Sequence, residues 1–171
     1  MARLIALQEE IELELRLQER EYDPFQMDLE WFTYELAIKI KRSEPDTAAG
    51  SGGPARRQRH TGKGKINRKD LSILLAGLDG LLDEGKDLRF EPYDLKFYME
   101  WRMETQLVFS IVTWFDMALS PRNATSRFPS AHAGFRFLAE LDSIRTFRSD
   151  LEAACIGSKT ASGGEAPTLI N

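Results

Sequence analysis

The sequence predicts an α+β fold, in which a mostly antiparallel sheet of about six strands carries two packed helices. Between Leu95 and Met103 every second residue is apolar, which is the period of a strand with one buried face. From Leu71 to Leu82 the leucines recur at spacings of three and four, which is typical of an amphipathic helix. With 171 residues, 42% of them apolar, the chain can bury a substantial core. We therefore expect one domain over residues 1–155.

The first element is a long half-exposed strand over residues 4–18, with a bend allowed at Glu9–Glu10. Its apolar residues fall on odd positions, and its other face carries Glu10, Glu12 and Glu14. Two interpretations of this acidic face stay open. It is either a solvated surface whose charges discourage edge pairing, or a recognition surface.

A second strand is predicted at Trp31–Lys41, where the alternation returns after a turn-rich link, and we expect it to pair with the first. Trp31 falls on its outer side, where it is either tucked under a loop or used as a binding hot spot. The residues expected to point inward are Phe32, Tyr34, Leu36, Ile38 and Ile40.

Residues 43–64 interrupt this pattern with a run rich in Gly, Pro, Ser and Arg, which predicts a mobile basic insertion. Residues 42–69 hold eight basic and two acidic side chains, a net charge of +6, so the rest of the chain carries −10. The cluster Arg56, Arg57 and Arg59 could contact phosphates, although no aromatic residues are interleaved with it. The acidic remainder suits a basic partner.

Two helices are predicted from their ends. Asn67 is placed to cap the first, with Asp70 at the third helical position, and Gly85 ends it. The second helix is capped by Asp142 or Ser143 and follows a strand over residues 132–137. Residues 118–130 read as a loop and residues 156–171 as a disordered tail. The side expected to be buried in the second helix holds Leu141, Ile144, Phe147, Leu151 and Ala154.

The central hairpin follows a short strand that starts at Leu88 and is interrupted at Pro92. We expect a three-residue loop over residues 104–106, because it sets Trp101 beside Phe109 and keeps both aromatic rings in the core. Leu107, Phe109, Ile111 and Phe115 then share the inner face. The opposite faces of the two strands include Tyr98, Glu100 and Trp114. Trp114 either supports a second covering layer or anchors a partner.

Catalytic chemistry is not indicated by the sequence. His60, His132 and Cys155 have no partners at informative spacing, so we expect no catalytic residues, metal site or cofactor. A single cysteine fits a reducing compartment. With no run of the roughly 20 apolar residues that a membrane helix needs and no signal pattern, the expected location is the cytoplasm, away from any membrane.

The order of elements resembles the WapI family of bacterial immunity proteins, the partners of polymorphic toxins. The resemblance spans roughly residues 5–155 and rests on EEIELELRL, on EYDPFQMDLEWFTYELAIKI, on FEPYDLKF, on WFD at residues 114–116 and on FRFLAELDSIRTFRSDLEAA. It implies a non-enzymatic protein that binds and neutralises a cognate toxin domain, often a nuclease, in the cytoplasm. The insertion at 43–64 and the tail depart from that pattern.

We therefore expect an immunity protein whose acidic strand meets a basic toxin domain. The expected partner-binding residues are Glu10, Glu12, Glu14, Tyr98, Glu100 and Trp114. Two alternatives belong to other classes: a nucleic-acid-associated protein that uses Arg56, Arg57 and Arg59, or a homodimeric scaffold joined through an exposed sheet face.

Overall fold

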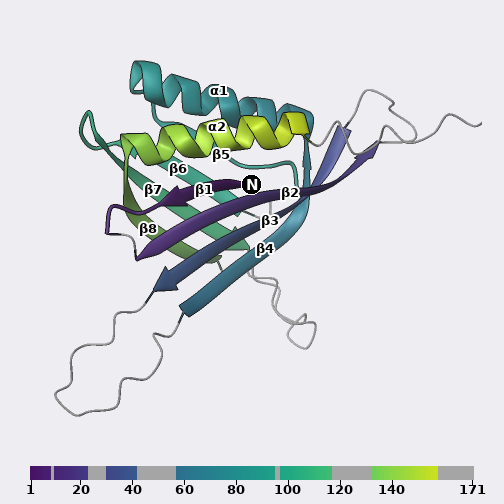
Figure 1. The fold of residues 1–171 in the computed structure, drawn as a ribbon, viewed down its shortest axis with the longest axis horizontal. Coiled ribbons are helices and arrows are strands. Elements are labelled where there is room, and N and C mark those ends of the chain that lie inside the picture. Colours follow the sequence, from purple (N-terminus) through teal and green to yellow (C-terminus); the bar gives the residue numbers. More distant parts are fainter. Residues whose placement is uncertain (9, 23–29, 42–56, 95–96, 117–131, 158–171) are drawn as a thin grey trace, which may run out of the picture.

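Two helices lie side by side over two antiparallel sheets in the computed structural model (Figure 1). The structure describes residues 1–8, 10–22, 30–41, 57–94, 97–116 and 132–157. Sheet A has the strand order β1 (Ala2–Ile5), β2 (Ile11–Tyr22), β3 (Glu30–Lys41) and β4 (Arg57–Asn67). Sheet B has the order β5 (Leu88–Phe90), β6 (Phe97–Met103), β7 (Val108–Asp116) and β8 (His132–Glu140). The helices are α1 (Arg68–Glu84) and α2 (Leu141–Gly157).

The α+β class and the antiparallel pairing are confirmed, but the expected single sheet of about six strands is wrong. Within the described residues there are eight strands in two sheets of four, and α1 connects one sheet to the other. The inner faces of both sheets and the buried sides of both helices form one core. Tyr34 of β3 meets Phe97 of β6 edge-on at 5.2 Å between ring centroids, and Trp101 of β6 meets Phe147 of α2 at 5.4 Å.

The first predicted strand is a hairpin. β1 pairs with β2, with Leu4 opposite Leu13, and the Ala6 N–H donates to the Ile11 carbonyl at 2.8 Å across the turn. The inward positions change parity at this turn, so Leu4 is buried in β1 while Leu7 is exposed. The alternation of apolar residues runs through the turn, because both strands of a hairpin have a period of two. The chain reversal was therefore not visible in the sequence pattern.

β3 is confirmed, including its inward face and its pairing with β2. β4 was missed: residues 57–64, predicted to be part of the insertion, continue into a strand paired with β3. The inner face of β4 places Gly62 opposite Leu36 and Gly64 opposite Tyr34. These glycines leave room for the large side chains of β3, so β4 lacks the alternating apolar residues that would predict a strand. The rest of the predicted insertion, up to residue 56, lies outside the described residues.

α1 begins and ends as predicted. The Asn67 side chain accepts a hydrogen bond from the Asp70 N–H at 2.7 Å, and Gly85 has the left-handed conformation, with φ of 67°, that favours glycine. Its buried stripe consists of Leu71, Leu74, Leu78 and Leu81. The helix runs along β5 and beside α2 (Figure 1).

The hairpin between β6 and β7 has the predicted faces but a different register. Trp101 lies opposite Ile111, not Phe109, because the first facing pair is Met103 and Phe109, with five residues, 104–108, between them in place of three. Thr105 stabilises this loop: its hydroxyl accepts from the Val108 N–H at 3.1 Å. A shift of two residues preserves parity, so Trp101, Phe109 and Ile111 are still buried. Leu107, predicted to point inward, is exposed in the loop.

α2 follows β8 directly, and the predicted cap is wrong. Because the helix begins at Leu141, Asp142 and Ser143 both lie in its first turn. Its buried residues are Ile144, Phe147, Leu151 and Cys155. The expected loop at 118–130 and nearly all of the expected tail lie outside the described residues. No helix that the structure describes is both long enough and apolar enough to cross a membrane.

Candidate functional site

The side of sheet B that faces away from the core is the candidate site. The strand register sets Tyr98 opposite Trp114 and Trp114 opposite Gly134, while Glu100 lies between Arg89 and Val112. Opposite residues in an antiparallel sheet share a face, so three of the predicted partner-binding residues lie together. We call this surface the sheet B outer face: Arg89, Tyr98, Glu100, Ser110, Val112, Trp114, Gly134, Arg136 and Leu138.

Trp114 is an exposed aromatic residue on this face, with 41% of its surface accessible. Its ring lies over Gly134, where an added Cβ would come within 2.4 Å of the ring carbons. Because Gly134 has no side chain, the indole ring can pack directly on the backbone of β8. Leu138 is exposed to the same extent, and Val112 is half-buried. The face therefore presents apolar groups to solvent, and a covering second layer is not found within the described residues.

Tyr98 and Glu100 form a polar pair beside Trp114. The Tyr98 hydroxyl donates to Glu100 Oε1 at 2.5 Å, and Arg89 Nε lies 3.4 Å from the same oxygen. Burial, the hydrogen bond and the negative charge of Glu100 raise the pKa of Tyr98. The phenol therefore stays protonated and is held as a donor, which fixes its ring on the face.

Glu12 and Glu14 do not form the exposed acidic face that the alternation predicted. Both are buried on the outer side of sheet A, with Glu14 only 2% exposed. Arg3 Nε lies 2.8 Å from Glu12, Lys39 contacts both carboxylates, and Arg16 Nη2 lies 2.9 Å from Glu14. Neighbouring cations neutralise these two charges, so little of either is left for a partner.

Glu10 lies apart from them, in the β1–β2 turn, and is exposed. This turn reaches β8, where the Leu7 N–H donates to the Leu138 carbonyl at 2.8 Å. Glu10, Arg136 and Leu138 all line a pocket of about 230 Å³ at this junction. Glu10 is therefore a neighbour of the sheet B outer face, and no pattern in the sequence predicts this proximity.

The arginine cluster of the nucleic-acid alternative is only partly described. Arg56 lies outside the described residues, and Arg57 begins β4. Arg59 Nη2 lies 2.6 Å from Glu35 on the neighbouring strand, so its charge is neutralised within the sheet. Trp31 is half-buried and contacts Tyr93 edge-on at 5.8 Å, which favours the interpretation that it is tucked under a loop.

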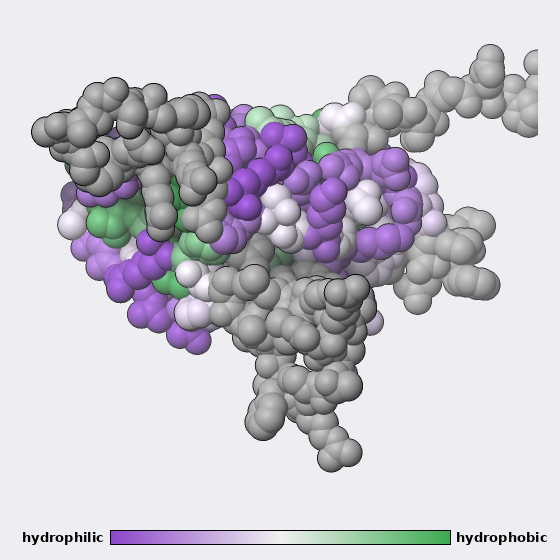
Figure 2. Space-filling model, turned by 90° about the horizontal axis from the view of Figure 1, so that it is seen from below, coloured by the Kyte–Doolittle hydropathy of each residue, from purple (hydrophilic) through white to green (hydrophobic). Residues whose placement is uncertain are grey.

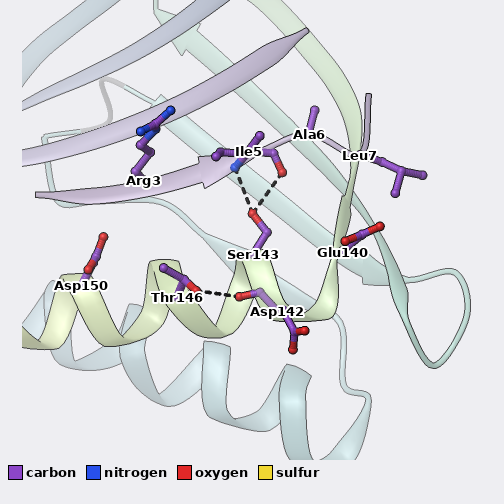
Figure 3. A pocket seen from close by; sticks show the side chains of 9 residues that line it. All are labelled: Arg3, Ile5, Ala6, Leu7, Glu140, Asp142, Ser143, Thr146 and Asp150. Atoms are coloured by element: carbon purple, nitrogen blue, oxygen red, sulfur yellow. Dashed lines mark hydrogen bonds between the residues drawn. The ribbon is translucent and has the colours of Figure 1, made fainter. Parts of the chain in front are cut away.

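A groove of about 570 Å³ runs between β1 and α2 on another part of the molecule (Figure 3). It is lined by carboxylates and hydroxyls, among them Glu140, Asp142, Ser143, Thr146 and Asp150. The Ser143 hydroxyl accepts from the Ile5 N–H and donates to the Ile5 carbonyl, both at 3.0 Å. In the part of the chain that the structure describes, no group of three or more His, Cys, Asp or Glu side chains could hold a metal ion.

Cys155 is buried in α2, and burial raises the pKa of its thiol.

The side of the molecule opposite the helices is mostly hydrophilic, with small hydrophobic patches (Figure 2). Three residues of the sheet B outer face were not predicted as site residues: Gly134, Arg136 and Leu138. They alternate with Phe135 and Phe137, which were predicted to point inward. That alternation was the available signal.

Comparison of the chain with protein-family models, with curated proteins and with solved structures gave no match.

Proposed function

We propose that the protein binds another protein through the sheet B outer face, and that it is an immunity protein that neutralises a cognate toxin domain by occlusion. The observation that carries the binding role is the placement of Trp114 over Gly134, beside the fixed Tyr98–Glu100 pair. The toxin as partner is supported by the resemblance to the WapI family described above.

Aromatic side chains that are exposed yet held in place are efficient anchors. They bury a large area on binding and lose little conformational entropy, because their rings are already fixed. Trp114 is seated by a glycine, and Tyr98 is held by its hydrogen bond to Glu100. Leu138 adds apolar area at the β8 end of the face. These features support a direct protein contact centred on β7.

Charge has a smaller role in this proposal than the sequence suggested. Glu12 and Glu14 are neutralised by Arg3, Arg16 and Lys39, so they are better explained as structural residues of sheet A. Glu10 remains available at the rim. A basic toxin surface would therefore meet Glu10 and the aromatic residues, and not the middle of β2.

The test begins with the gene directly upstream, which the proposal expects to encode a secreted protein with a C-terminal toxin domain, and that domain is then produced for the assays. Co-expression should protect bacteria from that domain, and titration calorimetry should show a complex. Trp114→Ala combined with Tyr98→Ala should weaken binding roughly 30-fold or more, which is about 2 kcal/mol for an interface hot spot. Ile73→Ala is the matched control, because Ile73 is an exposed apolar residue of α1.

Equal protection by the wild-type protein and the double variant would place the contact on another surface. Failure of the wild-type protein to bind the toxin domain would overturn the proposal itself. Light scattering measures the molar mass of the isolated protein and so tests for self-association. If the sheet B outer face is a homodimer interface, the wild-type protein should be a dimer and the double variant a monomer.

A further inference from the structure

The groove between β1 and α2 exposes a strand edge. β1 is the edge strand of sheet A and pairs with β2 on one side only. Its other edge faces α2 across the groove (Figure 3). β1 has four residues, which gives this edge a length of about 13 Å at the usual rise of a strand.

The backbone groups along that edge are only partly satisfied. Ile5 points its N–H and its carbonyl toward α2, where Ser143 Oγ bonds both at 3.0 Å. Alternate residues of a strand direct their backbone groups to the same side, so those of Arg3 also point into the groove. Among the described residues, neither the Arg3 N–H nor its carbonyl has a hydrogen-bond partner outside the β1–β2 pairing. Ser143 thus satisfies the backbone groups of Ile5 at one end of the edge. At the other end, the N–H and the carbonyl of Arg3 remain available to a ligand.

The opposite wall of the groove is one face of α2. Ser143, Thr146 and Asp150 follow one another at spacings of three and four, which places them on the same side of the helix. Figure 3 shows the Asp150 carboxylate pointing from α2 toward β1. The helix wall therefore sets a negative charge against the open part of the strand edge.

The charges in the groove are largely unbalanced. Asp150 and Glu140 form no ion pair with any residue that the structure describes, and Asp142 meets Arg145 at a distant 3.4 Å. The guanidinium of Arg3, the cationic group among the lining residues, is engaged by Glu12. A ligand that brings positive charge would gain Coulomb energy here, while a phosphate backbone would be repelled.

We propose that this groove binds a short extended segment of another protein, one that carries lysine or arginine side chains. The segment adds to the open edge of β1 through the backbone groups of Arg3, and its cationic side chains meet Asp150 and Glu140. Addition of a strand to an open sheet edge is a general mode of peptide recognition. Apart from Glu140 at the end of β8, this site lies on β1, the residues that follow it and α2, and it does not depend on the immunity role.

The affinity arm of the test uses a fluorescein-labelled peptide, acetyl-Lys-Thr-Lys-Thr-Lys-Thr-amide, and the full chain. Fluorescence anisotropy should show saturable binding that weakens with salt, whereas the Glu-Thr peptide of equal length should not bind. Asp150→Asn combined with Glu140→Gln should weaken binding at least fivefold. Asp83→Asn is the matched control, since it removes an exposed carboxylate from α1. Unchanged affinity in the double variant would overturn the proposal.

The backbone arm separates strand addition from simple charge attraction. The Lys-Thr peptide should shift the Arg3 amide resonance in ¹⁵N-labelled protein. A version N-methylated at alternate residues, which lacks those backbone donors, should bind at least fivefold more weakly. Equal binding by the methylated peptide would show a charge contact only and reject pairing with β1. Trp114→Ala should leave peptide binding unchanged, so the failure of either proposal can be recognised separately.

Discussion

Trp114 and Gly134 face each other across β7 and β8, and the indole occupies the space that a side chain at position 134 would need. An aromatic ring over a glycine covers a backbone that would otherwise be open to water and gives the ring a defined position. The contact with Gly134 therefore holds the Trp114 ring in a defined position even though the ring is exposed.

Gly134→Ala should displace that ring. The new Cβ would come within 2.4 Å of it, so the indole must rotate away from the sheet and become more accessible to acrylamide quenching. The free energy of unfolding should change by less than about 1 kcal/mol, because the contact lies on the surface. In a Trp114→Phe background the same substitution should leave quenching of the remaining tryptophans unaltered. An unchanged quenching profile in the single variant would contradict the pairing.

Glu14 should make the stability of the protein depend on pH in the acidic range. Burial alone would raise the pKa of its carboxyl, but Lys39 and Arg16 outweigh that effect and hold the pKa below its ordinary value of 4.5. A lowered pKa in the folded state stabilises the protein above pH 4.5, and this contribution is lost as the pH falls through the folded-state pKa. Urea unfolding followed from pH 7 downward measures it.

Glu14→Gln should lower the free energy of unfolding at pH 7 by about 1–3 kcal/mol, since charged hydrogen bonds are lost. The variant should also show a shallower decline in stability in acid than the wild-type protein. Glu19→Gln is the control, because Glu19 is exposed on the same strand. Parallel pH profiles for the wild-type protein and Glu14→Gln would contradict the ion-pair assignment.

The two ends of α1 should contribute separately to stability. Asn67→Ala removes the acceptor of the Asp70 N–H and should cost about 1 kcal/mol, and Gly85→Ala places a side chain at a φ of 67° and should cost a similar amount. Ser72→Ala, on the exposed side of the helix, should change stability little. Denaturant unfolding measures all three. Additive losses in the double variant are expected, because the caps lie at opposite ends.

Tyr34 and Asp94 should be coupled to Gly64. The Tyr34 hydroxyl donates to Asp94 Oδ2 at 3.1 Å, and a Cβ at position 64 would lie 1.9 Å from that carboxylate oxygen and 2.7 Å from the hydroxyl. Gly64→Ala should therefore destabilise the protein by about 1–3 kcal/mol through overpacking. Tyr34→Phe should cost only about 1 kcal/mol, the net value of one hydrogen bond. A double-mutant cycle with Asp94→Ala should show that Gly64→Ala costs less when the Asp94 carboxylate is already gone, because that oxygen is the nearest atom to the new Cβ.

The predictions that were confirmed rest on patterns within a single segment of the chain. The leucine spacing and the capping residues predicted α1 correctly, since a helix forms its hydrogen bonds within its own segment. The alternation in β3 and β6 correctly predicted which side chains are buried. It also brought Tyr98, Glu100 and Trp114 onto outward-facing positions, where the structure finds them on one surface.

The failures share a different origin. The alternation at residues 4–18 concealed the β1–β2 turn, and the glycines that make room for Tyr34 and Leu36 concealed β4. Glu12 and Glu14 read as a solvated acidic face because their cations lie on other segments, Arg3 in β1 and Lys39 in β3. A charge pattern along one strand contains no information about the strand that will lie beside it.

What the sequence determined by itself was the α+β class, the limits of α1 and the inward faces of β3, β6 and β7. Only the tertiary structure decided that the strands form two sheets, that Glu10 joins the sheet B outer face, and that the edge of β1 opens onto an acidic groove. The physical reason is that periodicity specifies which way a side chain points. Which segments meet depends on packing and charge pairing between residues far apart in the chain.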